Sequence, residues 1–168
     1  MSTLKVNALQ DTSGNPLSRV LQAATTVDSS SSQSVTSTSY VDAGSLSVAI
    51  TPTSSSSKIL LHYDANVGGN GIVFVRLMRG STAIGIGDAS SVRQRVTQGG
   101  VFRGSNDDKL SIFSGSFLDN PSSTSAQTYK LQVYRHSGTV TVNKPFNDTD
   151  ASYTGRGIST ITAMEVTQ

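Results

Sequence analysis

The stretch Ser45-Leu-Ser-Val-Ala-Ile50 alternates between small residues and large apolar residues. A period of two is typical of a β-strand with one face in the core, because successive side chains of a strand point to opposite faces. The same alternation recurs downstream, where Tyr129, Leu131 and Val133 share one face. The sequence therefore predicts half-buried strands of an antiparallel sheet.

Several other segments carry apolar residues on both alternating sets, for example Ile72 to Met78 and Leu110 to Leu118. A sandwich of two sheets has one inner face per sheet, so apolar side chains on the outer faces need a further partner. We therefore expect contacts between subunits on these strands. The candidates for this oligomer interface are Ile72, Phe74, Phe113 and Phe117.

Clusters of Gly, Asn, Asp, Ser and Pro divide the chain into about eight to ten strands. Among these signals, His136-Ser-Gly138 predicts a hairpin turn between the strands on either side. The segment Gly157 to Val166 fits a central closing strand. This pattern predicts an all-β fold, an antiparallel β-sandwich of jelly-roll type.

The N-terminal region follows a different pattern. Leu4 and Val6 alternate with polar residues, which predicts a short extended segment, and a dense turn signal follows. Beyond it, Asn15 could cap a brief helix with one face formed by Leu17, Val20 and Leu21. One or two helical turns are not stable alone. The segment is thus either a frayed terminus or a peg that becomes ordered on a partner.

Composition excludes several classes of protein. The 168 residues include no Cys, and the formal net charge is only +2. Disulfides, thiolate zinc sites and Cys nucleophiles are therefore ruled out. No apolar run is long enough for a membrane span, the first residues do not resemble a signal peptide, and no Lys/Arg cluster is present. We expect no cofactor, no nucleic-acid partner and no membrane insertion.

Few residues are available for catalysis. His62 and His136 are the only imidazoles, Glu165 is the only Glu, and no nucleophile elbow, phosphate loop or metalloprotease motif occurs. One alternative is a hydrolytic triad through His62 with Asp64 nearby. Another is a small hydrolase acting on surface polysaccharide, although the carboxylate pairs that such an enzyme needs are scarce. Asp148 and Asp150 bracket Thr149 and could hold Ca²⁺, although a solvated turn is the simpler interpretation. We expect no enzymatic activity.

Blocks along nearly the whole chain resemble one family. The opening Ser2-Thr-Leu-Lys-Val-Asn-Ala-Leu-Gln-Asp-Thr-Ser-Gly14 is similar to the start of many tail-fibre and other virion proteins of marine and freshwater bacteriophages. Blocks in the body resemble the distal β-domain of the same proteins: Ser45 to Pro52, Ser57 to Leu60, Arg79 to Asp88, Asp148 to Tyr153 and Ser159 to Val166.

The resemblance implies a virion structural protein made in the host cytoplasm. Residues 1–26 would form a segment that docks onto other virion proteins, with Leu4, Val6 and Leu9 as the docking residues. Residues 27–168 would form the displayed β-sandwich domain, as a homotrimer. Only Ala23 to Ser39 lies between the two parts, which favours a short tail fibre, a tail-tip adaptor or a capsid appendage over a long fibre.

The alternative function is a module of a tail fibre that binds a host receptor or a surface glycan. Arg93 and Arg95 would share one side if Ser91 to Thr97 were a strand, and they could meet an anionic glycan or a neighbouring virion protein. Aromatic rings could stack on sugar, although core or subunit packing explains most of them. The surface-binding candidates are Arg93, Arg95 and Tyr153; Tyr63 and Tyr134 are further rings of this kind.

Overall fold

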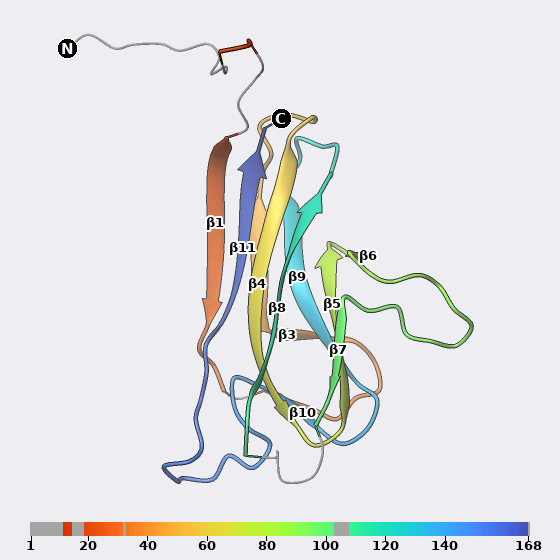
Figure 1. The fold of residues 1–168 in the computed structure, drawn as a ribbon, viewed down its shortest axis with the longest axis vertical. Helices are drawn as coiled ribbons and strands as arrows, with labels where there is room; N and C mark the ends of the chain where they lie inside the picture. Colours follow the sequence, from red (N-terminus) through yellow and green to blue (C-terminus); the bar gives the residue numbers. More distant parts are fainter. Residues whose placement is uncertain (1–11, 15–18, 32, 103–107, 168) are drawn as a thin grey trace, which may run out of the picture.

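The computed structural model describes residues 12–14, 19–31, 33–102 and 108–167, and these form two antiparallel sheets packed face to face (Figure 1). The predicted all-β antiparallel sandwich is therefore confirmed. The described residues contain no helix long and apolar enough to cross a membrane. The strands are β1 (Val20–Asp28), β2 (Ser34–Val35), β3 (Val41–Ile50), β4 (Lys58–Gly69), β5 (Ile72–Arg79), β6 (Thr82–Ile84), β7 (Gln98–Val101), β8 (Ser111–Asp119), β9 (Gln127–Arg135), β10 (Val140–Val142) and β11 (Ser159–Val166).

The front sheet consists of β1, β2, β4, β8, β10 and β11, and it is organised around β4. One side of β4 pairs with β11 and then with β10, and the other side pairs with β8. β1 pairs with the free side of β11, so the sequence-distant ends of the described chain lie side by side. The central position expected for Gly157 to Val166 is confirmed by β11.

The back sheet consists of β3, β5, β6, β7 and β9. β9 lies between β3 and β5, while β6 and β7 pair with successive parts of the other side of β5. The chain between β6 and β7 runs out as a long loop that projects from the sandwich (Figure 1). The back sheet therefore has three long strands, β3, β9 and β5, and an edge formed by the short strands β6 and β7 and the loop between them.

The core lies between the two sheets and follows the alternation of the strands. Leu46, Val48 and Ile50 of β3 are buried, and their neighbours Ser45, Ser47 and Ala49 are exposed, as the sequence predicts. The apolar set of β9 is buried in the same way. Burial of each such side chain contributes on the order of 1.5 to 3 kcal/mol. The fully buried inner-face residues also include Ile59, Leu61, Val67, Val73, Val75, Leu77 and Ile161.

Four local predictions are wrong. His136-Ser-Gly138 does not close a hairpin, because β9 belongs to the back sheet and β10 to the front sheet, so the chain crosses between sheets there. The sequence predicts that Val140 and Val142 alternate in burial with Thr139 and Thr141, but all three residues of β10 are buried. Ser91 to Thr97 is a loop rather than a strand. Val20 and Leu21 are strand residues of β1, not helical.

The N-terminal expectations fall largely outside the described part of the chain. Leu4, Val6, Leu9 and the Asn15 cap lie outside the described residues. The boundary expected between residues 26 and 27 falls within β1, which pairs with β11 from Val20 to Asp28. Residues 20–26 are thus part of the sandwich.

Candidate functional site

A groove lies on the outer face of the back sheet. Its volume is about 530 Å³, and its floor is formed by Ile72 and Phe74 of β5 and by Tyr134 of β9. His136, just after the end of β9, lines its rim. The floor residues face outward because they alternate with the buried Val73, Val75 and Val133. The wall is formed by Val92, Arg93 and Gln94 of the β6–β7 loop.

Aromatic rings form a continuous run along this floor. Phe74 and Tyr134 are cross-strand partners with ring centroids 5.9 Å apart, and Tyr40 lies 5.1 Å from Tyr134. The guanidinium of Arg76 lies over the Tyr40 ring at 3.7 Å, a cation–π contact, and bonds through two nitrogens to Gln132. Tyr134 is therefore packed between Phe74 and Tyr40, and Tyr40 in turn is packed against Arg76.

Space for the Phe74 ring comes from β7. Gly99 pairs with Phe74, and a Cβ at Gly99 would come within 2.7 Å of the Phe74 ring. A side chain at this position would therefore collide with the ring or displace it. The absence of a side chain at Gly99 keeps the half-buried Phe74 in place beside the groove.

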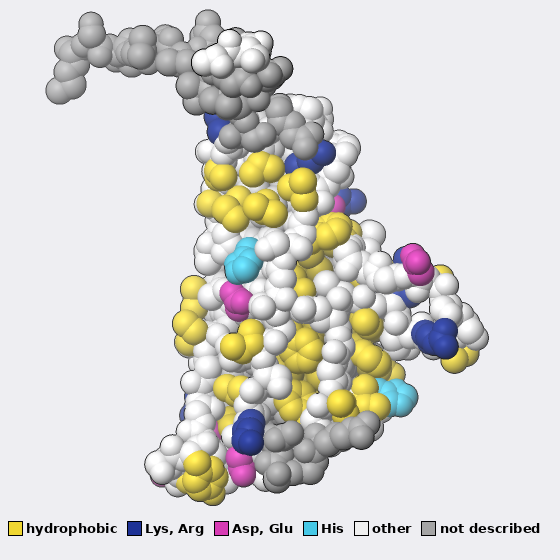
Figure 2. Space-filling model, viewed as in Figure 1, with side chains coloured by type: hydrophobic (Ala, Val, Ile, Leu, Met, Phe, Trp, Pro, Cys, Tyr) yellow, Lys and Arg dark blue, Asp and Glu magenta, His cyan; other side chains and the backbone are white. Residues whose placement is uncertain are grey.

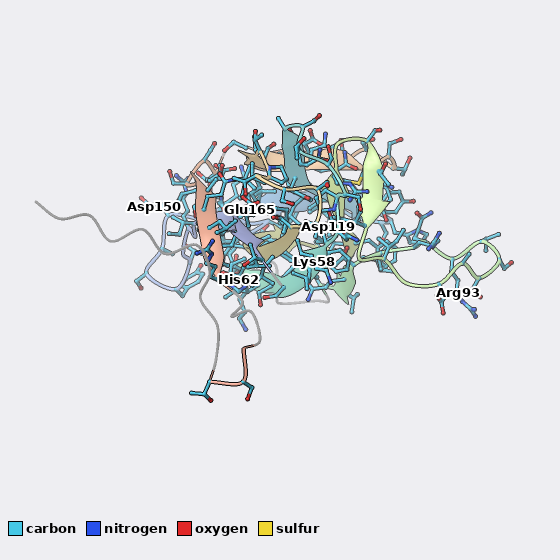
Figure 3. All side chains as sticks on the ribbon, turned by 90° about the horizontal axis from the view of Figure 1, so that it is seen from above. Lys58, His62, Arg93, Asp119, Asp150 and Glu165 are labelled. Carbon is cyan, nitrogen blue, oxygen red and sulfur yellow. The ribbon has the colours of Figure 1, made fainter. Side chains whose placement is uncertain are left out.

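The loop that walls the groove carries two of the predicted surface-binding residues. Arg93 is exposed, and its guanidinium donates to Ser90 Oγ over 2.7 Å; Figure 3 shows Arg93 on the projecting loop, away from both sheets. Arg95 donates instead to the carbonyl of Gly87 over 2.8 Å, within the same loop. Arg93 lines the groove, whereas Arg95 holds the loop together.

The outer face of the front sheet carries a row of apolar residues. The strand registers place Ala23, Met164, Leu60 and Leu118 next to one another on β1, β11, β4 and β8. Figure 2 shows hydrophobic side chains gathered across this end of the face. Leu118 is 46% exposed, and Val20, close by on β1, is 54% exposed. We call Ala23, Leu60, Leu118 and Met164 the apolar row.

Beside the apolar row lies a polar row that contains His62. The Nδ1 atom of His62 is 3.0 Å from Ser116 Oγ, and its Nε2 atom is 3.2 Å from Asp64 Oδ2. This order of groups resembles a hydrolytic triad. However, the side chains of His62 and Asp64 are 49% and 42% exposed on an open sheet face. Such a site cannot exclude water from a reacting bond, so geometry gives it little catalytic capacity.

Two of the expected interface residues belong to the core. Phe113 is 7% exposed and lies within the core cluster, and Phe117 packs against that cluster. Both rings rest on glycines of the back-sheet side, since a Cβ at Gly100 or Gly85 would come within about 3 Å of them. The predicted alternation of β8 is present, but the outward face predicted for Phe113 and Phe117 is wrong, because the outward apolar residues of this strand are Ile112 and Leu118.

The remaining candidates are dispersed. Tyr153 is 70% exposed on the β10–β11 loop, and Tyr63 is buried with its hydroxyl donating to Gln98. Asp148 in the same β10–β11 loop pairs with Arg156 at 2.7 Å, and this hydrogen bond holds the pKa of Asp148 below its ordinary value. Within the described residues, no group of three or more His, Cys, Asp or Glu side chains is placed to hold a metal ion.

Comparison with known proteins adds no assignment. No protein-family model matches this sequence, and no curated protein matches it. The function of the groove and of the apolar row therefore has to be inferred from their geometry and chemistry.

Proposed function

We propose that this chain is a non-enzymatic structural protein of a bacteriophage virion, either a short tail fibre or a tail-tip or capsid appendage. It docks onto other virion proteins through its N-terminal segment and displays an oligomeric β-domain. The resemblance of Ser2 to Gly14 to the start of virion proteins supports the docking role. The apolar row supports the oligomer, and it is the structural observation that carries the proposal.

The apolar row is suited to a second copy of the chain. Its four residues lie side by side on a regular sheet face, and Val20 and Val166 extend the apolar surface at the same end. Exposed apolar side chains become more stable when a partner removes them from water, so a partner that covers this surface would gain binding free energy. Each large side chain would contribute on the order of 1.5 to 3 kcal/mol on burial, before the entropic cost of association. A homotrimer is the assembly we propose.

The polar row that contains His62 is better suited to a hydrated sheet surface than to hydrolysis. Ser116, His62 and Asp64 satisfy one another's hydrogen bonds in a row that runs next to the apolar row. In the proposed assembly they form the polar rim beside an apolar contact, as in many protein interfaces. A catalytic role predicts instead that Ser116→Ala abolishes ester hydrolysis by the purified protein.

The docking role is tested by virion incorporation. Deletion of residues 1–11 should leave a folded oligomer that is absent from purified particles. A finer version replaces Leu4, Val6 and Leu9 by Asp, with Lys5→Ser and Asn7→Ser as the control on the alternate positions. The Asp variant should be excluded from particles and the control incorporated. Normal incorporation of both the deletion and the Asp variant would contradict the docking role.

A further inference from the structure

The groove on the back sheet has the size and composition of a ligand site. Its volume of about 530 Å³ falls within the range of roughly 300 to 1,000 Å³ that is typical of small-molecule sites. Its floor is apolar and aromatic, and polar groups lie at its rim on Arg93, Gln94 and His136. Nothing in the proposed structural role requires a concave site of this kind on the face opposite the apolar row.

A sugar ring matches this arrangement. One face of a pyranose presents C–H groups that pack on aromatic rings, while its hydroxyls radiate outward and need hydrogen-bonding partners. Phe74 and Tyr134 supply two neighbouring rings that stack on each other, with their planes inclined by 20° and their centroids 5.9 Å apart. Together they concentrate apolar aromatic surface on the floor of the groove. Gln94, on the loop above, provides a side-chain donor and acceptor for hydroxyls.

The side chains at the rim of the groove favour acidic sugars over neutral ones. Arg93 and His136 line the groove, and no carboxylate lies among the described residues that line it. Asp42, farther along the same sheet face, is paired with Lys130 at 2.9 Å and with Gln132, and these hydrogen bonds hold its pKa low despite the opposing effect of its partial burial. An Arg guanidinium matches a carboxylate in charge and in planar geometry.

We propose that this groove binds an acidic saccharide, with the sugar ring on Phe74 and Tyr134 and its carboxylate against Arg93. The loop from residue 85 to residue 97 carries Arg93 toward the ligand, and Arg95 stabilises that loop through the carbonyl of Gly87. The site is independent of virion docking, because it is formed entirely by residues of one described sandwich.

Calorimetry on the purified full-length protein tests the proposal with three probes. These are tri-galacturonic acid, the neutral galactotriose, and tri-glutamate, which carries similar charge without a sugar ring. We expect saturable binding of tri-galacturonic acid at millimolar or lower concentration, at least tenfold weaker binding of galactotriose, and no binding of tri-glutamate. Equal binding of tri-glutamate would show an acidic-peptide site instead and would overturn the proposal, as would absence of tri-galacturonate binding.

Variants at exposed positions separate the contributions. Arg93→Gln should weaken tri-galacturonate binding about tenfold and leave galactotriose unchanged, since it removes a charge-assisted contact. Val92→Asp introduces a carboxylate at a residue that is 93% exposed and should impair acidic binding more than neutral binding. Arg19→Gln, at an exposed residue just before β1 of the front sheet, is the matched control and should leave binding unchanged.

The aromatic floor is tested by Tyr134→Ala and Tyr134→Phe. The Ala variant should lose binding of both saccharides at least tenfold, whereas the Phe variant keeps the ring and should retain it. Near-ultraviolet circular dichroism of each variant reports folding independently. Unchanged saccharide binding by both a folded Tyr134→Ala variant and Arg93→Gln would place the saccharide elsewhere and overturn the assignment.

Discussion

Tyr129 donates its hydroxyl hydrogen to Asp119 over 2.7 Å, and this bond joins the back sheet to the front sheet inside the sandwich. Arg79, also on the back sheet, pairs with the same carboxylate at 2.8 Å. Burial and the neighbouring Asp119 carboxylate raise the pKa of the Tyr129 hydroxyl well above its ordinary value, so it remains a donor. The two sheets are therefore connected by a charged group as well as by apolar packing.

Asp119→Asn should destabilise the fold by about 3 kcal/mol, because it leaves the partly buried Arg79 without its counter-ion. Tyr129→Phe should cost less, about 1 kcal/mol, since it removes one hydrogen bond and leaves the ion pair. Urea unfolding of both single variants and of the double variant gives the coupling between the two groups. Strictly additive costs would contradict a direct interaction in solution.

Glu165 makes the fold sensitive to acid. Its side chain is fully buried on β11, where burial alone would raise its pKa. Hydrogen bonds from Gln22 and from the backbone and hydroxyl of Thr53, each 2.7 Å long, outweigh burial and lower the pKa to about 2 from an ordinary 4.5. The folded state thus favours the ionised carboxylate. Its stabilising contribution is present above about pH 5 and is lost as the pH falls toward 2.

Glu165→Gln should therefore lower the free energy of unfolding by about 2 kcal/mol at pH 7, because the amide has only one acceptor oxygen and no charge. That oxygen can still accept from Thr53, but the amide NH2 then faces the donating Nε2 of Gln22. The difference between wild type and variant should shrink as the pH is lowered from about 5 to 2. Urea unfolding across this range measures it. A difference independent of pH would mean that the carboxylate is not the stabilising species.

Asn143 is fully buried with a φ of 61°, in the left-handed region. Its amide donates to the carbonyls of Asp28 and Ser30 and accepts from Ser159, so it links three separate segments. Asn143→Gly keeps the backbone conformation and should cost about 2 to 3 kcal/mol through the unsatisfied partners. Asn143→Ala should cost about 1 kcal/mol more because of its positive φ. Thermal unfolding compares the two, and equal stability of both variants would exclude backbone strain.

The apolar row predicts which surface change disrupts assembly. Leu118→Asp should convert the oligomer to monomers in sedimentation velocity, because it places a charge in the proposed contact. Ile112→Asp is the matched control, since Ile112 is exposed on the same strand about 20 Å away and outside the row. It should leave the oligomer intact. Dissociation by Ile112→Asp alone would move the contact to the other end of the sheet.

Local patterns predicted much of the fold but little of the site. The alternation around Leu46 and Leu131 identifies buried faces because a strand's side-chain period is local. Pairing partners are not local: β5 meets β9 across more than fifty residues, which is what brings Phe74 to Tyr134. The approach of Ser116 to His62 depends on the same kind of distant register. No single stretch of sequence carries that information.

The sequence also fails to predict which face of β8 is buried, for a related reason. Alternation shows which residues share a face but not which face is buried, and both sets of β8 are apolar. The choice depends on glycines in distant strands that leave room for Phe113 and Phe117. A search for glycines opposite aromatic residues would become possible only once the strand order is known.

The pairing of β1 with β11 determines how the domain carries mechanical load. The two strands are antiparallel from Val20 opposite Val166 to Asp28 opposite Ser159, with one register shift between Val20 and Gln22. Their hydrogen bonds lie perpendicular to the strands. In a protein held by residues that precede β1, tension applied at the far end of the sandwich pulls β1 along its own axis and strains all of these bonds together. The β1–β11 hydrogen bonds are then loaded in shear and resist the force together, instead of breaking one after another.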